Sequence, residues 1–153
     1  SRMVENILKL GETEVKKVMT PIENVEGVSR RDLDENLTDL LIETSRSRIP
    51  VFKGEGTATG YVHIKDVLMQ LAAGKSVIEK DIVRFAYIVG ENKKAGQLLR
   101  EFQSGNYHIA FVSDAEGKIL GIVTLEDLLE ELVGEILDEY DLQSHANGNN
   151  TSN

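Results

Sequence analysis

Residues Gly60-Tyr-Val-His-Ile-Lys-Asp-Val-Leu-Met-Gln-Leu71 return, 61 positions later, as Gly121-Ile-Val-Thr-Leu-Glu-Asp-Leu-Leu-Glu-Glu-Leu132. Upstream of each copy, Arg48-Ile-Pro-Val-Phe52 matches His108-Ile-Ala-Phe-Val112 at an offset of 60. The offsets of 60 and 61 indicate that the turn joining the two segments differs in length by one residue between the repeats. Further upstream, two sets of apolar residues share helical spacing: Leu37, Leu40, Leu41 and Thr44, and Ala95, Leu98, Leu99 and Phe102. Three matches in the same order indicate an internal repeat.

Each repeat is predicted to run strand, helix, strand, turn, strand, helix. The spacing i, i+3, i+4, i+7 predicts amphipathic helices over 37–44 and 95–102. Short β-rich runs that flank turns at 53–56 and 114–117 predict two hairpins, with strands at 49–52, 60–64, 109–112 and 121–124. A further helix is predicted over about 4–19, and the last helix is predicted to continue to Leu137.

The composition excludes several classes of protein. The chain has 153 residues, a formal net charge of −9 and no cysteine, so disulfides and thiolate metal sites are excluded. The charge argues against a general nucleic-acid binder, which needs clustered Lys and Arg. No apolar run is long enough to cross a bilayer. No phosphate-binding loop or Ser-His-Asp pattern is present either, and an enzyme is the least favoured class.

The motifs resemble a known family. The β-α-β-β-α repeat that ends in Gly-hydrophobic-Val-Thr-x-x-Asp is similar to the CBS domain, which occurs in tandem with pseudo-two-fold symmetry. The resemblance is closest to the CorC/CorB and cyclin-M (CNNM) proteins, and it rests on four stretches: Val18-Met-Thr-Pro21, Ser47-Arg-Ile-Pro-Val51, His63-Ile-Lys-Asp-Val-Leu68 and the residues from Gly121 to Ile136.

The resemblance implies an α/β tandem CBS pair. We expect an N-terminal helical lead-in over 1–17, CBS domain 1 over 18–78, CBS domain 2 over 79–141 and a disordered polar tail over 142–153. It also implies a homodimer that binds an adenine nucleotide, AMP or ATP, with Mg²⁺ accompanying ATP. The family's members are magnesium and cobalt efflux proteins, so we expect a cytoplasmic module, as the cytosolic domain of an integral membrane protein or as the partner of a membrane transport domain.

Thr124 and Asp127 are the first candidates for the nucleotide site. A threonine followed three residues later by a carboxylate is also a capping box, which on the spacing alone is the favoured interpretation. A helix N-terminus offers backbone donors to a phosphate. By the resemblance, Thr124 adds a hydroxyl there and Asp127 accepts hydrogen bonds from the ribose hydroxyls.

The other candidates line the same cleft in CBS pairs. Arg48, beside Ser47, is expected to contact phosphate, and its counterpart His108 is expected to donate a second contact. The alternative for Arg48 is a solvated cation at a strand edge, and the alternative for His108 is a structural histidine. The remaining members of the predicted site are Ile49 and Pro50 beside Arg48, and Ile122. Thr20 and Val25 are expected on the entry strand of the first repeat, with Thr20 as a partner for ribose or base and Val25, like Ile122, as an apolar wall or a plain core residue.

The first repeat has His63 where the second has Thr124, and it keeps Asp66. Because imidazole is bulkier and lacks the hydroxyl, we predict that this second site is weaker or empty; the alternative for His63 is a polar residue at a strand end. The acidic run from Glu126 to Asp141 is interpreted as a solvated helix face rather than a metal site. The rival function is a structural dimerisation module without ligand.

Overall fold

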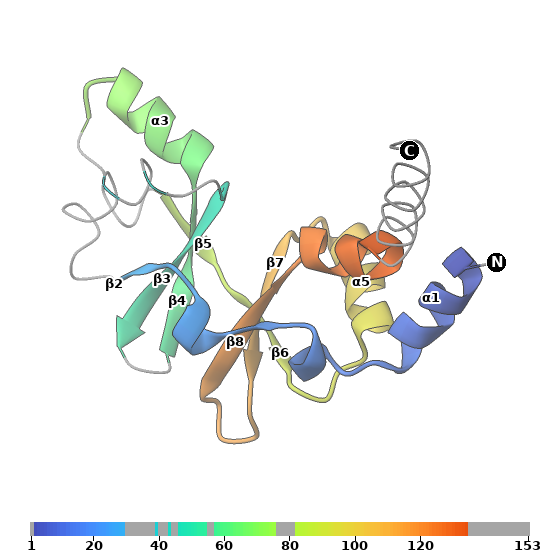
Figure 1. The fold of residues 1–153 in the computed structure, drawn as a ribbon. Helices are drawn as coiled ribbons and strands as arrows, with labels where there is room; N and C mark the ends of the chain where they lie inside the picture. Colours follow the sequence, from blue (N-terminus) through green and yellow to red (C-terminus); the bar gives the residue numbers. More distant parts are fainter. Residues whose placement is uncertain are drawn as a thin grey trace, which may run out of the picture.

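The computed structural model describes residues 2–29, 39, 43, 46–54, 57–75 and 82–134. Its strands form two four-stranded sheets (Figure 1). One sheet has the order β1 (Thr20–Pro21), β8 (Ile119–Thr124), β7 (Ile109–Ser113), β6 (Tyr87–Gly90). The other has the order β2 (Val28–Ser29), β3 (Arg48–Gly54), β4 (Thr57–His63), β5 (Val83–Phe85).

The two sheets repeat one topology. The hairpins β3–β4 and β7–β8 are antiparallel, and each has a parallel neighbour on one side, β2 or β6. An antiparallel edge strand completes each sheet, β5 beside β4 and β1 beside β8. This correspondence confirms the predicted α/β fold of two similar repeats.

The edge strands are exchanged between the repeats. β1 precedes the first hairpin in the chain but pairs with β8 of the second repeat. β5 is the entry strand of the second repeat but pairs with β4 of the first. The paired strands approach closely at Gly60 and Gly121. A Cβ on Gly60 would collide with the carbonyl oxygen of Arg84, and one on Gly121 with that of Thr20. The recurring glycine is therefore required where an exchanged strand crosses its hairpin.

Strand register corrects the offset of 60 assigned to the upstream segments. Arg48 lies opposite His63, and Ile109 lies opposite Thr124, so the offset is 61 throughout and the turn length is unchanged. The counterpart of Arg48 is Ile109, and that of His108 is Ser47. The error arose because both segments are short apolar runs that match almost equally well after a shift of one residue.

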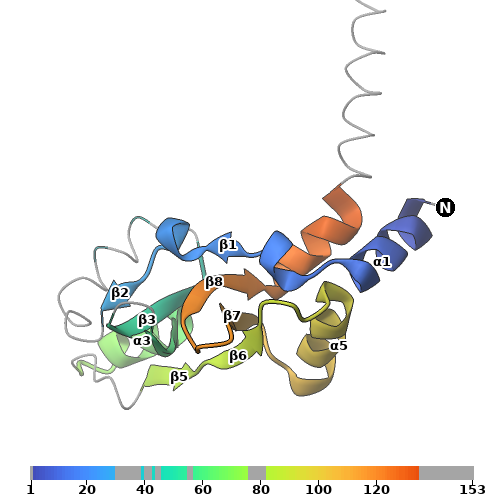
Figure 2. The same cartoon turned by 90° about the horizontal axis from the view of Figure 1, so that it is seen from below.

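The helices of the second repeat and the N-terminal helix pack together. α1 (Arg2–Glu12) lies beside α5 (Ala95–Gly105) and the helical residues 125–134 (Figures 1 and 2). The buried Asn6 donates from Nδ2 to the carbonyl oxygen of Leu132 at 2.8 Å. α3 (Ile64–Ala72) follows β4 in the first repeat. None of the described helices has the length and apolar content required to cross a bilayer.

The prediction of one helix over 4–19 is wrong at its C-terminal end. After Glu12 the chain turns to bond the segment before α5: Ala95 donates to the carbonyl of Thr13 at 2.7 Å, and Val15 donates to that of Lys93 at 2.8 Å. A 3-10 helix, η1 (Val15–Lys17), follows and buries Val15. The predicted helix over 37–44, the end of the last helix and the tail over 142–153 lie wholly or mostly outside the described residues.

The core has a separate cluster between the sheets. Its buried members are Ile109, Phe111, Ile119 and Ile122, and residues of the first repeat pack against them, among them Phe52 and Tyr61. Phe52 meets Phe111 edge to face with ring centroids 6.4 Å apart. The repeats thus share an apolar interface as well as their edge strands, and this fixes the position of one repeat's strand ends relative to the other's.

Candidate functional site

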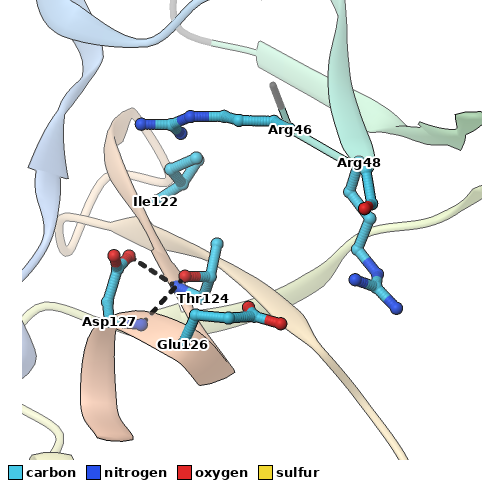
Figure 3. A pocket seen from close by; sticks show the side chains of 7 residues that line it. Arg46, Arg48, Ile122, Thr124, Glu126 and Asp127 are labelled. Atoms are coloured by element: carbon cyan, nitrogen blue, oxygen red, sulfur yellow. Dashed lines mark hydrogen bonds between the residues drawn. The ribbon is translucent and has the colours of Figure 1, made fainter. Parts of the chain in front are cut away.

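A cavity of about 290 Å³ opens between the two repeats (Figure 3). The first repeat contributes the start of β3, and the second contributes β8 and the first turn of the helix after it. The lining residues are Arg46, Ser47, Arg48, Ile122, Thr124, Glu126 and Asp127. Five of the twelve predicted site residues therefore lie together: Ser47, Arg48, Ile122, Thr124 and Asp127.

Thr124 and Asp127 form a reciprocal capping box. The backbone N–H of Asp127 donates to Thr124 Oγ1 at 3.1 Å, and the backbone N–H of Thr124 donates to Asp127 Oδ2 at 2.9 Å. The capping interpretation is confirmed. The box leaves binding capacity, because the Thr124 hydroxyl keeps its hydrogen and Asp127 Oδ1 has no hydrogen-bond partner among the described residues.

Two arginines of the first repeat line the cavity opposite this helix start. The side chain of Arg46 extends across the cavity on the side of Ile122, whereas the guanidinium of Arg48 points away from Thr124 and Asp127 (Figure 3). The sequence interpretation missed Arg46, although a second arginine so close to Arg48 in an acidic chain was a usable signal. It also missed the exposed Glu126 as a lining residue.

Four predicted residues lie beside this cavity rather than in it. Thr20 pairs with Ile122 across β1 and β8. Ile49 and Pro50 are buried in β3. His108 does not line the cavity; it is half-buried, and its carbonyl accepts from the N–H of Leu125 at 2.9 Å.

Val25 was expected on the same strand as Thr20, and this is wrong. The 3-10 helix η2 (Ile22–Asn24) ends β1 before Val25. Val25 packs against the inter-sheet cluster and lines a separate groove with Phe52 and Ile119. Val25 and Ile122 thus belong to one cluster without lining one cavity.

The equivalent position in the first repeat has different chemistry. His63 caps α3: its Nδ1 accepts from the N–H of Lys65 at 3.1 Å. Asp66 does not complete a capping box, because Arg84 takes its carboxylate in a bidentate ion pair with an Nη2–Oδ2 distance of 2.9 Å. Burial lowers the pKa of His63, and the charges of Arg48 and Arg84 lower it further against the opposing effect of Asp66.

Among the described residues, no group of three or more His, Asp or Glu side chains is arranged to hold a metal ion. The candidate site is a polar cavity at a helix N-terminus, lined by two arginines and two carboxylates, with an apolar wall at Ile122. Such a site suits an anionic ligand with hydroxyl groups.

Comparisons with known proteins agree with this description. A family model of the CBS domain matches residues 75–134. The magnesium and cobalt efflux protein CorC of Salmonella typhimurium is 34% identical over 141 residues, which are 91% of this chain and 48% of the relative. The chain spans about half the length of the curated relatives it matches.

Solved structures resemble the chain as closely. One is a CBS domain of the bacterial CNNM/CorC family Mg²⁺ transporter in complex with ATP, at 35% identity and a TM-score of 0.77, covering 87% of this chain and 96% of that one. A conserved domain from Neisseria meningitidis MC58 is 32% identical, with a TM-score of 0.76 and 82% of each chain covered. Fold and cavity together define a tandem pair of CBS domains. The chain belongs to the CNNM/CorC family, and it corresponds to that family's CBS-domain part.

The lowered pKa of His63 predicts a pH-dependent stability. The unfolded chain has the ordinary histidine pKa near 6.5 and the folded chain a lower one, so just below pH 6.5 the unfolded state binds more protons. The free energy of unfolding should therefore fall as pH drops through this window, and it should be insensitive to His63 above it. Protonation of Nδ1 would also remove the cap.

Thermal unfolding of the wild type and of His63→Asn, at about pH 7.5 and about pH 5.5, measures this effect. Asparagine caps helices without titrating, so the wild type should lose more stability on acidification than the variant. Equal losses would contradict the assignment.

Proposed function

We propose that this chain is a regulatory module that binds an adenine nucleotide, ATP with Mg²⁺, in the cavity between its two CBS domains. We further propose that it acts as the cytosolic sensor part of a magnesium and cobalt efflux protein. The observation that carries the proposal is the meeting of Arg46 and Arg48 with Thr124 and Asp127 in one cavity. The relative solved in complex with ATP supports the choice of ligand.

The ribose and the phosphates of a nucleotide find complementary groups in the cavity. Asp127 Oδ1 accepts from a ribose hydroxyl, as a carboxylate oxygen without a partner can. The N-terminus of the helix at 125–134 and the Thr124 hydroxyl donate to a phosphate. The guanidinium groups of Arg46 and Arg48 supply local positive charge for the phosphates, which the chain as a whole, with a net charge of −9, does not.

The carboxylate of Glu126 in the same cavity favours ATP that carries a magnesium ion. Glu126 lies beside the proposed phosphate path, so free ATP would meet both the arginines and a like charge. A bound Mg²⁺ lowers the charge of the triphosphate and offsets that repulsion. We therefore propose MgATP as the species bound.

The polar groups of this cavity support binding rather than catalysis. The Thr124–Asp127 pair is engaged in capping the helix. His63 and His108, the residues best suited to acid–base work near neutral pH, do not line the cavity. The CBS domain and the CNNM/CorC family indicate a non-enzymatic module in the same way.

A route for regulation starts at the ligand. The helical residues 125–134 begin at the capping box, and about two turns further along Leu132 accepts the hydrogen bond of Asn6 from α1. Because α1 also packs on α5, a ligand that displaces the start of the helix has a packed path to the N-terminal segment. We propose that this segment passes the change to an attached or partner membrane transport domain.

The ligand-free alternative, a structural dimerisation module, has its own support. The capping box is satisfied without ligand, and α3 exposes three neighbouring apolar side chains, Leu68, Met69 and Leu71. Such a face is typical of an interface, and a two-fold partner of the same chain would cover it. We propose the homodimer together with nucleotide binding.

The homodimer predicts the effect of charge on this face. Leu68→Lys combined with Leu71→Lys should convert a dimer to a monomer, since two buried ammonium groups would lack partners. Light scattering measures the mass, and Ile88→Lys, at an exposed apolar residue of β6, is the control. A monomeric wild type across a wide concentration range would disprove the dimer.

Nucleotide binding predicts both stabilisation and asymmetry between the repeats. ATP with Mg²⁺ should raise the melting temperature of the wild type by mass action on the folded state. Asp127→Ala should weaken binding about ten- to a hundredfold, as loss of a carboxylate acceptor costs about 1–3 kcal/mol. Asp66→Ala, its matched control, should change the affinity little.

Calorimetric titration measures both affinities on variants whose folding has been checked, because Asp127→Ala also removes a cap. If millimolar adenine nucleotide with magnesium produced neither heat nor a melting shift in the wild type, the chain would be a structural module. Equal losses from the two variants would instead place nucleotide in both repeats.

The arginines predict selectivity for phosphate. Arg46→Ala and Arg48→Ala should each weaken ATP more than adenosine, by about tenfold or more where a charge-assisted hydrogen bond is lost. The larger effect is expected at Arg46, whose side chain crosses the cavity. Arg100→Ala, at an exposed arginine of α5, is the control. Parallel losses of ATP and adenosine affinity would exclude phosphate contact.

A further inference from the structure

Strand register relates each residue of the nucleotide cavity to a counterpart in the other repeat. Asp66 corresponds to Asp127, and His63 corresponds to Thr124. On the exchanged edge strands, Thr20 pairs with Ile122, while Arg84 pairs with Tyr61, the counterpart of Ile122. Arg84 therefore holds, beside the first repeat's hairpin, the position that Thr20 holds beside the second.

At this position the two repeats carry side chains of different reach and charge. Arg84 donates from Nε to Asp66 Oδ2 at 3.0 Å and from Nη2 to Oδ1 at 3.2 Å. Both carboxylate oxygens are thereby used. Thr20 is too short to do the same to Asp127, whose Oδ1 has no hydrogen-bond partner among the described residues. A planar guanidinium on a carboxylate also matches the bidentate geometry that two adjacent ribose hydroxyls would need.

We propose that Arg84 is a built-in occupant of the first repeat's half-site, and that it limits the chain to one nucleotide. The inference rests on the proposed function, because it assigns to Asp66 the acceptor role that Asp127 has in the second repeat. The sequence prediction attributed a weak first site to His63 alone. Arg84 supplies a direct cause, since it engages the acceptor itself.

The rest of this half-site sets the ligand it takes once Arg84 is removed. The second-repeat counterparts of Arg46 and Arg48 are Tyr107 and Ile109, so an aromatic and a buried apolar residue stand where the nucleotide cavity has its two proposed phosphate-binding cations. The opened site therefore favours a nucleoside over a nucleoside triphosphate. Adenosine is the suitable probe.

The test compares wild type with Arg84→Thr, which installs the residue found at the equivalent position, and with Arg84→Gln, which removes the charge but keeps a long side chain. Calorimetry should give one ATP per chain in all three proteins. In Arg84→Thr, adenosine should give an additional binding event absent from the wild type. The ring signals of His63 in NMR spectra should shift with that event and stay unmoved in the wild type.

Asp66→Asn is the matched control, because it frees Arg84 but removes the carboxylate. It should show no additional event, and Arg84→Thr combined with Asp66→Asn should lose the event again. A folded Arg84→Thr and a folded Arg84→Gln that both bind adenosine with wild-type stoichiometry would overturn the inference, as would a wild type that already binds two ligands with a shift at His63. Absence of the ATP event in the wild type would instead contradict the proposed function, so the two failures can be told apart.

Discussion

The exchange of edge strands is the constraint on which the other features depend. β1 completes the second repeat's sheet and β5 completes the first's, so neither sheet can form fully from its own repeat. Each exchanged strand lies against a hairpin glycine, Gly121 or Gly60, that leaves no room for a Cβ. The exchange therefore holds the two sheets in a fixed relation before any ligand binds, and the apolar cluster around Phe111 adds to this. A cavity that draws Arg46–Arg48 from one repeat and Thr124–Asp127 from the other is possible only because that relation is fixed.

In the two similar repeats, the N-termini of α3 and of the helix at 125–134 are capped by different side chains. Both must satisfy backbone N–H groups exposed at a helix N-terminus. In the second repeat, the Thr124 hydroxyl and one oxygen of the Asp127 carboxylate each accept a backbone N–H. The hydroxyl hydrogen and the other carboxylate oxygen are left for a ligand. The first uses the imidazole of His63 and gives its carboxylate to Arg84. Capping and binding are thus not competing interpretations of Thr124 and Asp127, because the box consumes only part of their hydrogen-bonding capacity.

How much the sequence could predict depended on the range of the interaction. The repeat, its hairpins and the helix at 95–102 follow from local periodicity, and the capping box follows from a spacing of three residues. All of these were recovered. The ion pair of Arg84 with Asp66 joins residues 18 positions apart through the exchanged strand. No local sequence pattern predicts it. The same holds for the end of α1, which is set by contacts between Thr13–Val15 and residues 93–95. Val25 was misplaced because a 3-10 turn interrupts a stretch whose residues have the composition of a strand.

The position of the cavity also explains why a regulatory use of the nucleotide is physically reasonable. A ligand at the start of the helix at 125–134 contacts an element that is tied to α1 about two turns further along, through the hydrogen bond from Asn6 to Leu132. Asn6 is a buried polar side chain, only 4% exposed, and a buried donor that loses its partner costs more than an exposed one. The helix and α1 are therefore expected to move together rather than separate. A small displacement at Thr124 would then reach the N-terminal segment without being absorbed in a loop, which is the physical basis of the proposed regulatory role.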